Sequence, residues 1–443
     1  MTTTAERPTR AARGAAPEPL PLRRVVADRV AALRESLDRP LTSYYLLLGS
    51  IGLLLTIGLI MVLSSSSVWS YRVFDGNSYA VFVKQLTWVL LAVPFVLVAV
   101  RIPHRALRRF AWPALGLSLV LLALTQTAMG VTVQGNKNWL ALGPIQIQPA
   151  ELAKLAVILW CAHIFATKER LLGNWKHTLV PVVPVMAVVV GLVVLGHDLG
   201  TALVLMAIVL GLLWVVGAPG KMFVGSLMVA GVAALTLAAT SKERMSRLLT
   251  FSDPFQSFDG SGWQAAHGIF ALSSGGLFGK GIGASQQKWG TLPAAHTDFI
   301  FAVLGEELGL VGTLLVLGLF LTLAYAGLRV ARRTADPFAR YMAAGITVWI
   351  TGQMMINIGM VLALLPVIGL PLPLVSYGGS ALLPSLVALG LLVSFARAEP
   401  GAEVARLARR RRGDAVVAGG FRRRMVRQAA PRPRQGGRRG ARR

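Results

Sequence analysis

Residues able to do acid–base chemistry stand where a polar segment of the chain runs into a long apolar one. In the stretch AHTDFIFAVLGEELG (295–309), His296 and Asp298 directly precede the apolar run. A carboxylate in such a place can take the proton of a substrate hydroxyl group, which is the role of a general base. The structural alternative is that Thr297 or Asp298 caps the first turn of the following helix. Asp298 is therefore the first candidate for a catalytic residue.

Two more carboxylates, Glu306 and Glu307, follow inside the apolar run. Neighbouring residues of a helix point to different faces, so we expect at least one of them to face the protein interior. A charge inside an apolar span needs a partner or a polar cavity. The structural alternative to a site role is an ion pair with Lys154 or Arg247.

Two further pairs of charged or polar residues stand at the edges of apolar runs. Glu151 and Lys154 lie three residues apart in PAELAKL, hence on one helical face, where they can pair with each other or flank a cavity. His197 and Asp198 occupy a short turn before another apolar run. Asp198 can bind a ligand there, or it can cap the helix that follows.

A segment rich in proline and glycine, 357–381, interrupts the apolar pattern near the end of the membrane region. Its three prolines break helix, and Ser376, Gly378 and Gly379 follow them. Non-helical backbone at membrane depth is tolerated only where it is buried in protein or lines a cavity. The segment is therefore expected to form part of a site.

Several common kinds of site are excluded by the sequence. The glycine-rich stretch LSSGGLFGKGIGAS (272–285) lacks the lysine–serine pair of a phosphate-binding loop. No cluster of His and Cys has the spacing of a zinc site, and no Ser-His-Asp order is present. Cys161 is the only cysteine, so an intramolecular disulfide cannot form.

The composition indicates which elements hold these residues. The chain is 54% hydrophobic and only 14% charged, too apolar for an ordinary soluble domain. Its formal net charge of +26 comes largely from arginines at the two ends and in short loops, which favours cytoplasmic basic segments over nucleic-acid binding. A spanning helix needs roughly 20 apolar residues. Ten such runs occur, at about 43–64, 84–101, 112–130, 149–166, 179–196, 199–217, 222–240, 298–328, 339–365 and 377–397.

We therefore expect an all-α integral membrane protein with about ten transmembrane helices and both termini in the cytoplasm, because the loops that would then face the cytoplasm are basic. The membrane domain would cover 43–397, between disordered basic tails at 1–42 and 398–443. The segments 131–148 and 241–297 would lie outside, the longer one as a large extracellular loop forming a lid or site wall.

Basic residues in the long outer loop oppose the usual charge bias of membrane proteins. Arg244, Arg247 and Lys288 all lie in 241–297. An anionic ligand held by the loop would explain them.

Five motifs, taken together and in order, resemble the SEDS family of shape, elongation, division and sporulation proteins. They are QPAELAK (148–154), DLGT (198–201), RMSRLLTFSDP (244–254), LPAAHTDFIFAVLGEELG (292–309) and GLPLPLVSYGGSA (369–381). The resemblance runs from about residue 40 to 400. The AHTDFIF wording and the arginine-rich tails are more similar to the cell-division branch of high-GC Gram-positive bacteria than to the elongation branch. Asn138 stands where relatives often carry an arginine, which weakens any role for the first outer loop.

The resemblance implies a peptidoglycan glycosyltransferase that polymerises lipid II on the outer face of the cytoplasmic membrane, at the division septum. The acceptor hydroxyl would attack an anomeric carbon whose leaving group is undecaprenyl diphosphate. Asp298 would be the catalytic carboxylate. A class B penicillin-binding protein transpeptidase and other division proteins would be its partners, with membrane lipids around it and no nucleic acid.

Substrate contacts are expected from a larger set of polar, charged and glycine residues. These are Glu151, Lys154, Arg244, Arg247, Lys288, His296, Glu306, Glu307, Ser376, Gly378 and Gly379. The basic members would hold the diphosphate, alone or with a divalent cation, Mg²⁺ or Mn²⁺. Burial and the two neighbouring glutamates would raise the pKa of Asp298, and Lys154 would oppose them.

Three other functions remain as alternatives. A lipid II flippase would also have ten helices with broken segments and internal charges, but it needs polar groups reachable from both faces, whereas the motifs here gather on the outer half. An elongation-type polymerase differs only in the branch of the family. A scaffold for the division machinery would use the basic tails.

Overall fold

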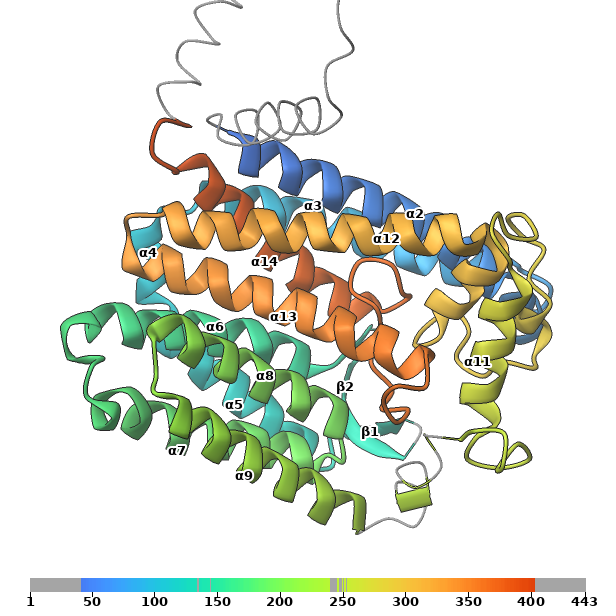
Figure 1. The fold of residues 1–443 in the computed structure, drawn as a ribbon, viewed down its shortest axis with the longest axis horizontal. Coiled ribbons are helices and arrows are strands. Elements are labelled where there is room, and N and C mark those ends of the chain that lie inside the picture. Colours follow the sequence, from blue (N-terminus) through green and yellow to red (C-terminus); the bar gives the residue numbers. More distant parts are fainter. Residues whose placement is uncertain are drawn as a thin grey trace, which may run out of the picture.

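Long helices lying side by side make up most of the molecule (Figure 1). The computed structural model describes residues 41–133, 135–143, 145–239, 245–246, 249, 251 and 253–402. The two predicted basic tails lie almost entirely outside these residues, so their disorder stays a prediction. The first and last described residues lie at the same end of the bundle (Figure 1).

The helices follow the apolar runs of the sequence closely. They are α2 (Thr42–Val73), α3 (Ala80–Arg101), α4 (His104–Arg109), α5 (Ala111–Thr125), α6 (Pro149–Thr167), α7 (Trp175–Leu195), α8 (Leu199–Val216), α9 (Gly220–Ala239), α11 (Trp263–Ser274), α12 (Ile300–Arg333), α13 (Pro337–Val361) and α14 (Gly379–Arg397), with single turns η1 (Glu169–Leu171) and η2 (Gln287–Trp289). Among the described residues, eight helices are long and apolar enough to cross a membrane. These eight match eight of the ten predicted spans.

The other two predicted spans correspond to α5 and α9. α5 has 15 residues, short of a full crossing, and α9 has 20 but is not among the eight. The count of ten spans, and the side on which the termini lie, therefore stay predictions.

A small antiparallel sheet replaces the first predicted outer loop, which is a correction to the all-α expectation. Strands β1 (Gly130–Val133), β2 (Asn136–Leu142) and β3 (Ile145–Ile147) pair in that order. The turns between them contain Gly135 and Gly143, whose positive φ values of 82° and 64° suit glycine. The apolar runs in these three strands are too short to predict a strand from sequence alone.

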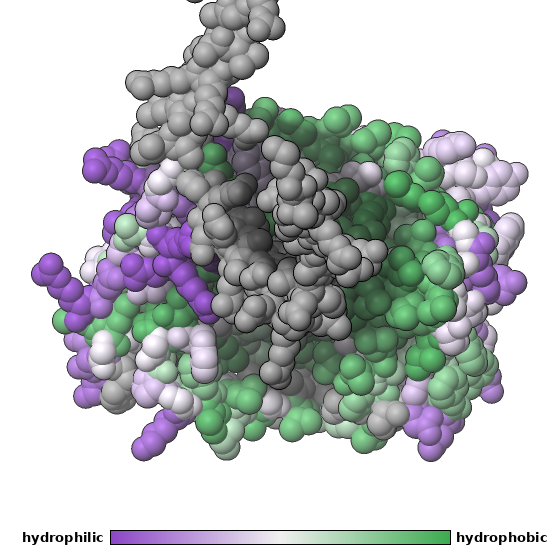
Figure 2. Space-filling model, turned by 45° about the horizontal axis from the view of Figure 1, so that its top comes forward, coloured by the Kyte–Doolittle hydropathy of each residue, from purple (hydrophilic) through white to green (hydrophobic). Residues whose placement is uncertain are grey.

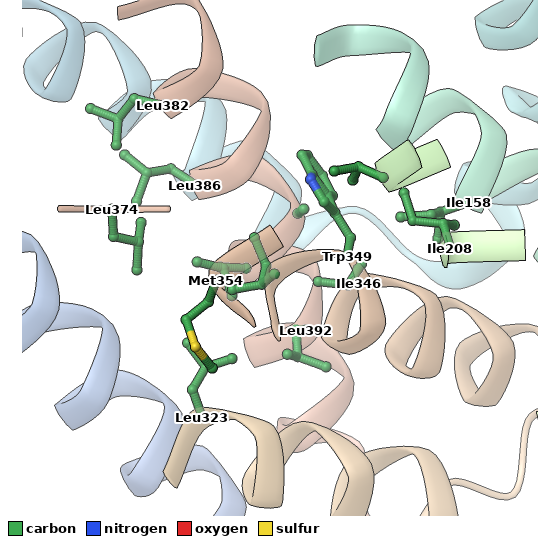
Figure 3. Packing of buried hydrophobic residues seen from close by; sticks show 14 of the residues in the cluster. Ile158, Ile208, Leu323, Ile346, Trp349, Met354, Leu374, Leu382, Leu386 and Leu392 are labelled. Atoms are coloured by element: carbon green, nitrogen blue, oxygen red, sulfur yellow. The ribbon is translucent and has the colours of Figure 1, made fainter. Parts of the chain in front are cut away.

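The centre of the bundle is α13, which packs against α12, α6 and α8. Its Ile346 and Trp349 lie beside Ile158 and Ile208, and the leucines of α14 fill the other side (Figure 3). Small residues let the helices approach closely, since a Cβ at Gly345 would run into Ile158. With no hydrophobic drive between helices in lipid, this close packing supplies much of the stability.

The outer surface has the pattern of a membrane protein. On the face shown in Figure 2, the coloured surface between the two ends is mostly apolar, and polar residues gather at the ends. Large apolar side chains stand exposed along α3 and α12, including Leu90, Val98 and Leu321. Such a belt suits contact with lipid.

At one end of the bundle, α11 runs across the ends of α12 and α13 (Figure 1). α11 belongs to the predicted long outer segment 241–297, of which the structure describes 245–246, 249, 251 and 253–297. Over its described residues 253–297, the segment is folded and packs against α12 and α13.

α12 contains a break that was not predicted from the sequence. Gly309 has φ 67° and ψ −164°, which is not helical. The loop 276–281 lies along the break, where the amides of Leu310 and Val311 donate to the carbonyls of Gly276 and Leu277 at 3.0 and 3.1 Å. In the opposite direction, the amide of Lys280 donates to Glu306 at 2.9 Å. The loop therefore satisfies the backbone groups that the break leaves open.

Candidate functional site

A large cavity of about 1630 Å³ opens at the end of the bundle where α11 lies. The helices α3, α6, α8 and α14 all begin at its wall. The rest of the lining comes mainly from the sheet, the segments 293–298, 366–371 and 377–378, and single residues of α2, α9 and α11. Among the predicted site residues, Glu151, Asp298, Gly378 and Gly379 line this one cavity. Asp198 and Thr201 of the DLGT motif line it too, so the structure brings together residues from four of the five sequence motifs.

Asp298 stands on the cavity wall, two residues before α12, and is half-buried. The N-cap of α12 is Phe299, so the prediction that Thr297 or Asp298 caps this helix is wrong. The side-chain amide of Asn357 donates to the backbone carbonyl of Asp298 at 2.8 Å. A Cβ built at Gly369 would lie 3.6 Å from the Asp298 Oδ2 atom, so the carboxylate lies against that glycine. Its backbone is therefore fixed from α13.

The segment between α13 and α14 is non-helical from 362 to 378, as the prolines predict. Amide side chains of α13 hold it. Asn357 donates to the carbonyl of Leu370 at 2.6 Å, and Gln353 donates to the carbonyl of Pro371 at 2.9 Å. The unwound carbonyls are thereby satisfied in a place without bulk water.

Ser376 ties this segment to the one that carries Asp298. Its hydroxyl donates to the carbonyl of Thr297 at 2.6 Å and accepts from the amide of Leu372 at 2.8 Å. The amide of Gly378, one of the cavity-lining glycines, donates to Gln85 of α3 at 3.3 Å. The position of Ser376 makes it a positioning residue, and its predicted contact with substrate stays a prediction.

Glu151 and Lys154 form the ion pair that their spacing predicts. The Lys154 ammonium lies 2.7 Å from Glu151 Oε2, and both side chains are buried. Lys154 also donates to Gln353 at 3.0 Å, and its ammonium lies 5.1 Å from the centre of the Trp349 ring. Of the pair, Glu151 reaches the cavity wall. The positive charge of Lys154 is balanced inside the bundle.

Asp198 both caps a helix and lines the cavity. It is the N-cap of α8 and accepts from the amide of Thr201 at 2.9 Å, so the predicted cap is confirmed. Its other oxygen accepts from Asn138 and from Gln148, each at 2.8 Å. Asn138, the departure from the family wording, thus joins β2 to α8. The departure at Asn138 weakens any role predicted for the first outer loop. That loop nevertheless forms the sheet, which lines part of the cavity.

His296 lies between two aromatic rings, at 5.0 Å from Trp69 and 5.8 Å from Tyr377 between ring centres. Burial lowers the pKa of His296 to about 4, so the ring is neutral near pH 7. A neutral ring can orient neighbours but does not carry the charge that would attract a diphosphate.

Glu306 and Glu307 are fully buried with partners other than those expected. Glu306 accepts from Lys280 at 2.9 Å and from the Ser285 hydroxyl at 2.6 Å. Glu307 accepts from the Ser64 hydroxyl of α2 at 2.6 Å, and the Lys288 ammonium lies 3.5 Å away.

The predicted pairing of these glutamates with Lys154 is wrong, because Lys154 is engaged by Glu151 on α6. Arg244 and Arg247, the latter being the alternative partner, lie outside the described residues. Within the part of the cavity wall that the structure describes, Glu306, Glu307 and Lys288 do not appear. They fasten the loop to α12 and α2, and a direct contact with substrate stays a prediction for them.

Three polar residues at the site were missed at the level of sequence. Gln353 and Asn357 lie inside a predicted span and were taken as part of it, although two buried amides in an apolar helix are a signal in themselves. Lys84, at the start of a predicted span, lines the cavity.

A metal held by protein side chains alone finds no support in the described part of the chain, where no group of three or more His, Cys, Asp or Glu side chains could hold an ion.

Comparisons with known proteins agree with one another. The family model described as "Cell cycle protein", whose name joins FtsW, RodA and SpoVE, matches residues 45–400. "Probable peptidoglycan glycosyltransferase FtsW" of Mycobacterium tuberculosis is 41% identical over 370 residues, which cover 83% of this chain and 70% of that protein. "Stage V sporulation protein E" of Bacillus subtilis is 36% identical over 348 residues, 78% of this chain and 94% of the relative.

Solved structures have the same fold. One, described as "Structural coordination of polymerization and crosslinking by a peptidoglycan synthase complex", has a TM-score of 0.65 at 28% identity, covering 80% of this chain and 97% of that chain. The crystal structure of the rod shape determining protein RodA of Thermus thermophilus has a TM-score of 0.58 at 28% identity, covering 80% and 96%.

Proposed function

Because this chain belongs to the FtsW, RodA and SpoVE family of cell cycle proteins, we propose that its cavity is the active site of a peptidoglycan glycosyltransferase, with Asp298 as the general base. The protein is a peptidoglycan glycosyltransferase and acts in septal cell-wall synthesis, in agreement with its similarity to the FtsW relatives. Its proposed substrate is lipid II. The protein is proposed to cross the cytoplasmic membrane several times and to act at the division septum.

The proposed reaction needs few groups. Asp298 accepts the proton of the acceptor sugar hydroxyl as its oxygen attacks the anomeric carbon of the donor. The bond from that carbon to the diphosphate oxygen breaks, and undecaprenyl diphosphate leaves with the bonding electron pair. A base and stabilisation of the leaving charge are sufficient for such a transfer. Attack opposite the leaving group inverts the anomeric carbon.

The observation that carries this proposal is the place of Asp298. It stands on the wall of the cavity, and it does not cap α12. Its Oδ2 atom lies against Gly369, at the unwound segment that also lines the cavity. A substrate in the cavity can therefore reach the carboxylate of Asp298.

A one-sided cavity also favours the enzyme over the flippase. Four helices on its wall, α3, α6, α8 and α14, begin there, and α2 and α9 contribute residues near their ends. The rest of the wall comes from α11, the sheet and loops at the same end of the bundle. A carrier needs polar access from both faces. The end of the bundle that holds the cavity is proposed to face outward.

The test is glycan synthesis from purified lipid II by the reconstituted protein carrying Asp298→Asn. Loss of a general base should lower the rate by roughly 10²–10⁴-fold. Because Asp298 is not the cap of α12, membrane level and thermal stability should stay near those of the wild type.

The matched control is Asp259→Asn, which makes the same change at an exposed position away from the described cavity wall. It should polymerise at the wild-type rate. Near-normal polymer from a well-inserted Asp298→Asn protein would refute the assignment of the base.

A further inference from the structure

The leaving group of the proposed reaction carries a diphosphate, yet the cavity wall is rich in acidic side chains. Glu151, Asp198 and Asp298 all line it. A dianionic group entering a site with three carboxylates needs cationic compensation nearby. The source of that positive charge is the question.

Two of the four cations predicted to hold the diphosphate, Lys154 and Lys288, are engaged elsewhere. Lys154 pairs with Glu151 inside the bundle, at 2.7 Å. Lys288 is buried, donates to the carbonyl of Gly283 at 2.6 Å and lies 3.5 Å from Glu307. Lys280 pairs with Glu306. Arg244 and Arg247 lie outside the described residues.

Lys84 differs from these lysines. Along the cavity wall, as far as the structure describes it, Lys84 is the only lysine or arginine. It stands in the first turns of α3, and its side chain is exposed. Its ammonium lies 4.2 Å from the centre of the Phe74 ring. This cation–π contact orients the lysine side chain without neutralising its charge. Within the part of the chain that the structure describes, Lys84 forms no ion pair with a carboxylate, unlike Lys154, Lys280 and Lys288.

The surroundings of Lys84 suit an anion. Trp88, one helical turn further along α3, also lines the cavity and lies so close to Gly379 that a Cβ there would clash with its indole. The start of α14 is thereby held against this face of α3. The first amides of a helix carry partial positive charge, which adds to the charge of the lysine.

We propose that Lys84 binds the diphosphate of the lipid-linked substrate and stabilises it as leaving group, so that Lys84 and Asp298 serve opposite ends of the transfer. Both line the same cavity. The inference rests on the proposed function, because it assumes a diphosphate-linked donor. It assigns Lys84 a role in binding that the sequence motifs did not indicate.

The test compares Lys84→Gln and Lys84→Arg with the wild type in steady-state polymerisation of lipid II by the full-length protein. Loss of a charge-assisted contact should lower kcat/KM by about 10- to 100-fold in Lys84→Gln. Lys84→Arg keeps the charge and should retain most activity. Inorganic pyrophosphate should inhibit the wild type and should inhibit Lys84→Gln at least about tenfold more weakly, by the same loss of contact.

The matched control is Lys221→Gln, the same change at an exposed lysine at the start of α9 that does not line the described cavity wall. It should leave kcat/KM and pyrophosphate inhibition unchanged. If Lys84→Gln also keeps both wild-type values while the wild type is active and Asp298→Asn is not, the role of Lys84 is refuted and the proposed function stands. An inactive wild type, or an active Asp298→Asn protein, would instead count against the proposed function.

An anionic phospholipid also carries a phosphate group that a lysine can bind. A separate set of assays therefore distinguishes the lipid headgroup from the substrate diphosphate. The assays are run in vesicles of phosphatidylcholine alone and in vesicles that also contain phosphatidylglycerol. An equal loss for Lys84→Gln in both supports binding of the substrate diphosphate. A loss confined to the phosphatidylglycerol vesicles would mean that Lys84 binds lipid headgroups, and would overturn the proposal.

Discussion

At the scale of single residues, the site contains two kinds of charged side chain. Some are neutralised by partners inside the bundle, and others are proposed to take part in the reaction. Lys154 is fully buried, and Glu151 beside it gives it a partner, because a lone charge in this interior would be very costly. Asp198 accepts from the side-chain amides of Asn138 and Gln148 and from the backbone amide of Thr201. For Asp298, Asn357 holds the backbone carbonyl, and the side chain lies on the cavity wall.

His296 gives a residue-scale prediction about pH. Burial lowers the pKa of His296 to about 4, whereas an unfolded histidine titrates near about 6.5. Between these values the unfolded chain binds the proton and the folded protein does not, so stability falls as pH drops. The contribution of His296 should be complete above about pH 6.5 and should be lost as pH falls towards 4.

The measurement is thermal unfolding of the purified protein at pH 7 and pH 4.5, for the wild type and His296→Phe. The phenylalanine keeps an aromatic ring between Trp69 and Tyr377 but cannot titrate. The variant should lose less stability on acidification than the wild type. The same loss in both proteins would show that His296 does not contribute.

At the scale of elements, the broken helix α12 and the loop along it form a unit. Gly309 has a positive φ, and a Cβ there would meet the backbone of Leu277 and Gly279. Gly309→Ala should therefore separate the loop from α12, at a cost of about 1–3 kcal/mol in strain alone. Hydrogen exchange should then rise at the amides of 280–281 and 310–311.

The control is Gly318→Ala in the same helix, where nothing lies within 4 Å of the added methyl group. It should keep the slow exchange of the wild type, and alanine should slightly favour the helix. Slow exchange in Gly309→Ala would contradict the proposed coupling of loop and helix.

The helices could be predicted from sequence because length and apolarity are local properties. The sixth predicted span, 199–217, and α8 (Leu199–Val216) differ by one residue. The sheet could not be predicted in this way, since each of its strands is short and gains meaning only from its neighbours. The break at Gly309 is likewise hidden in an apolar run, and only the loop beside it makes the break possible.

The site was predictable in part for the same reason. Asp298 and the pair Glu151–Lys154 could be identified from their types and spacing. The partners of Glu306 and Glu307 could not, because the choice among several lysines depends on how a distant loop folds back onto α12.

At the scale of the whole molecule, the sidedness of the cavity is open to a direct test. Cys161 is the only cysteine and is buried, so Cys161→Ala provides a background without cysteine. A new cysteine at Asp259 should react with a membrane-impermeant maleimide on intact cells, because its segment is predicted to lie outside. A cysteine at Arg170 should react only after lysis. The reverse pattern would invert the topology.

A second whole-molecule prediction concerns assembly. One structural neighbour is a peptidoglycan synthase complex in which polymerisation and crosslinking are coordinated. We expect the isolated chain to polymerise lipid II slowly and its rate to rise on adding its cognate class B penicillin-binding protein, measured as glycan product on a gel. A transpeptidase with an inactivated serine should stimulate equally, since the effect is one of binding. An unchanged rate would argue against the partnership.

Beside the Lys280–Glu306 ion pair, the loop along α12 is joined to the helix through backbone hydrogen bonds at 276, 277, 280 and 281, and this affects which substitutions the loop tolerates. Backbone bonds do not depend on side-chain identity, so Leu277, Phe278 and Ile282, which are 62%, 80% and 63% exposed, are free to be exchanged for other apolar residues. Gly275, Gly279 and Gly309 are not, since any side chain there would enter the backbone of the opposite segment. Natural variants should therefore tolerate change at the three apolar positions and be eliminated at the three glycines.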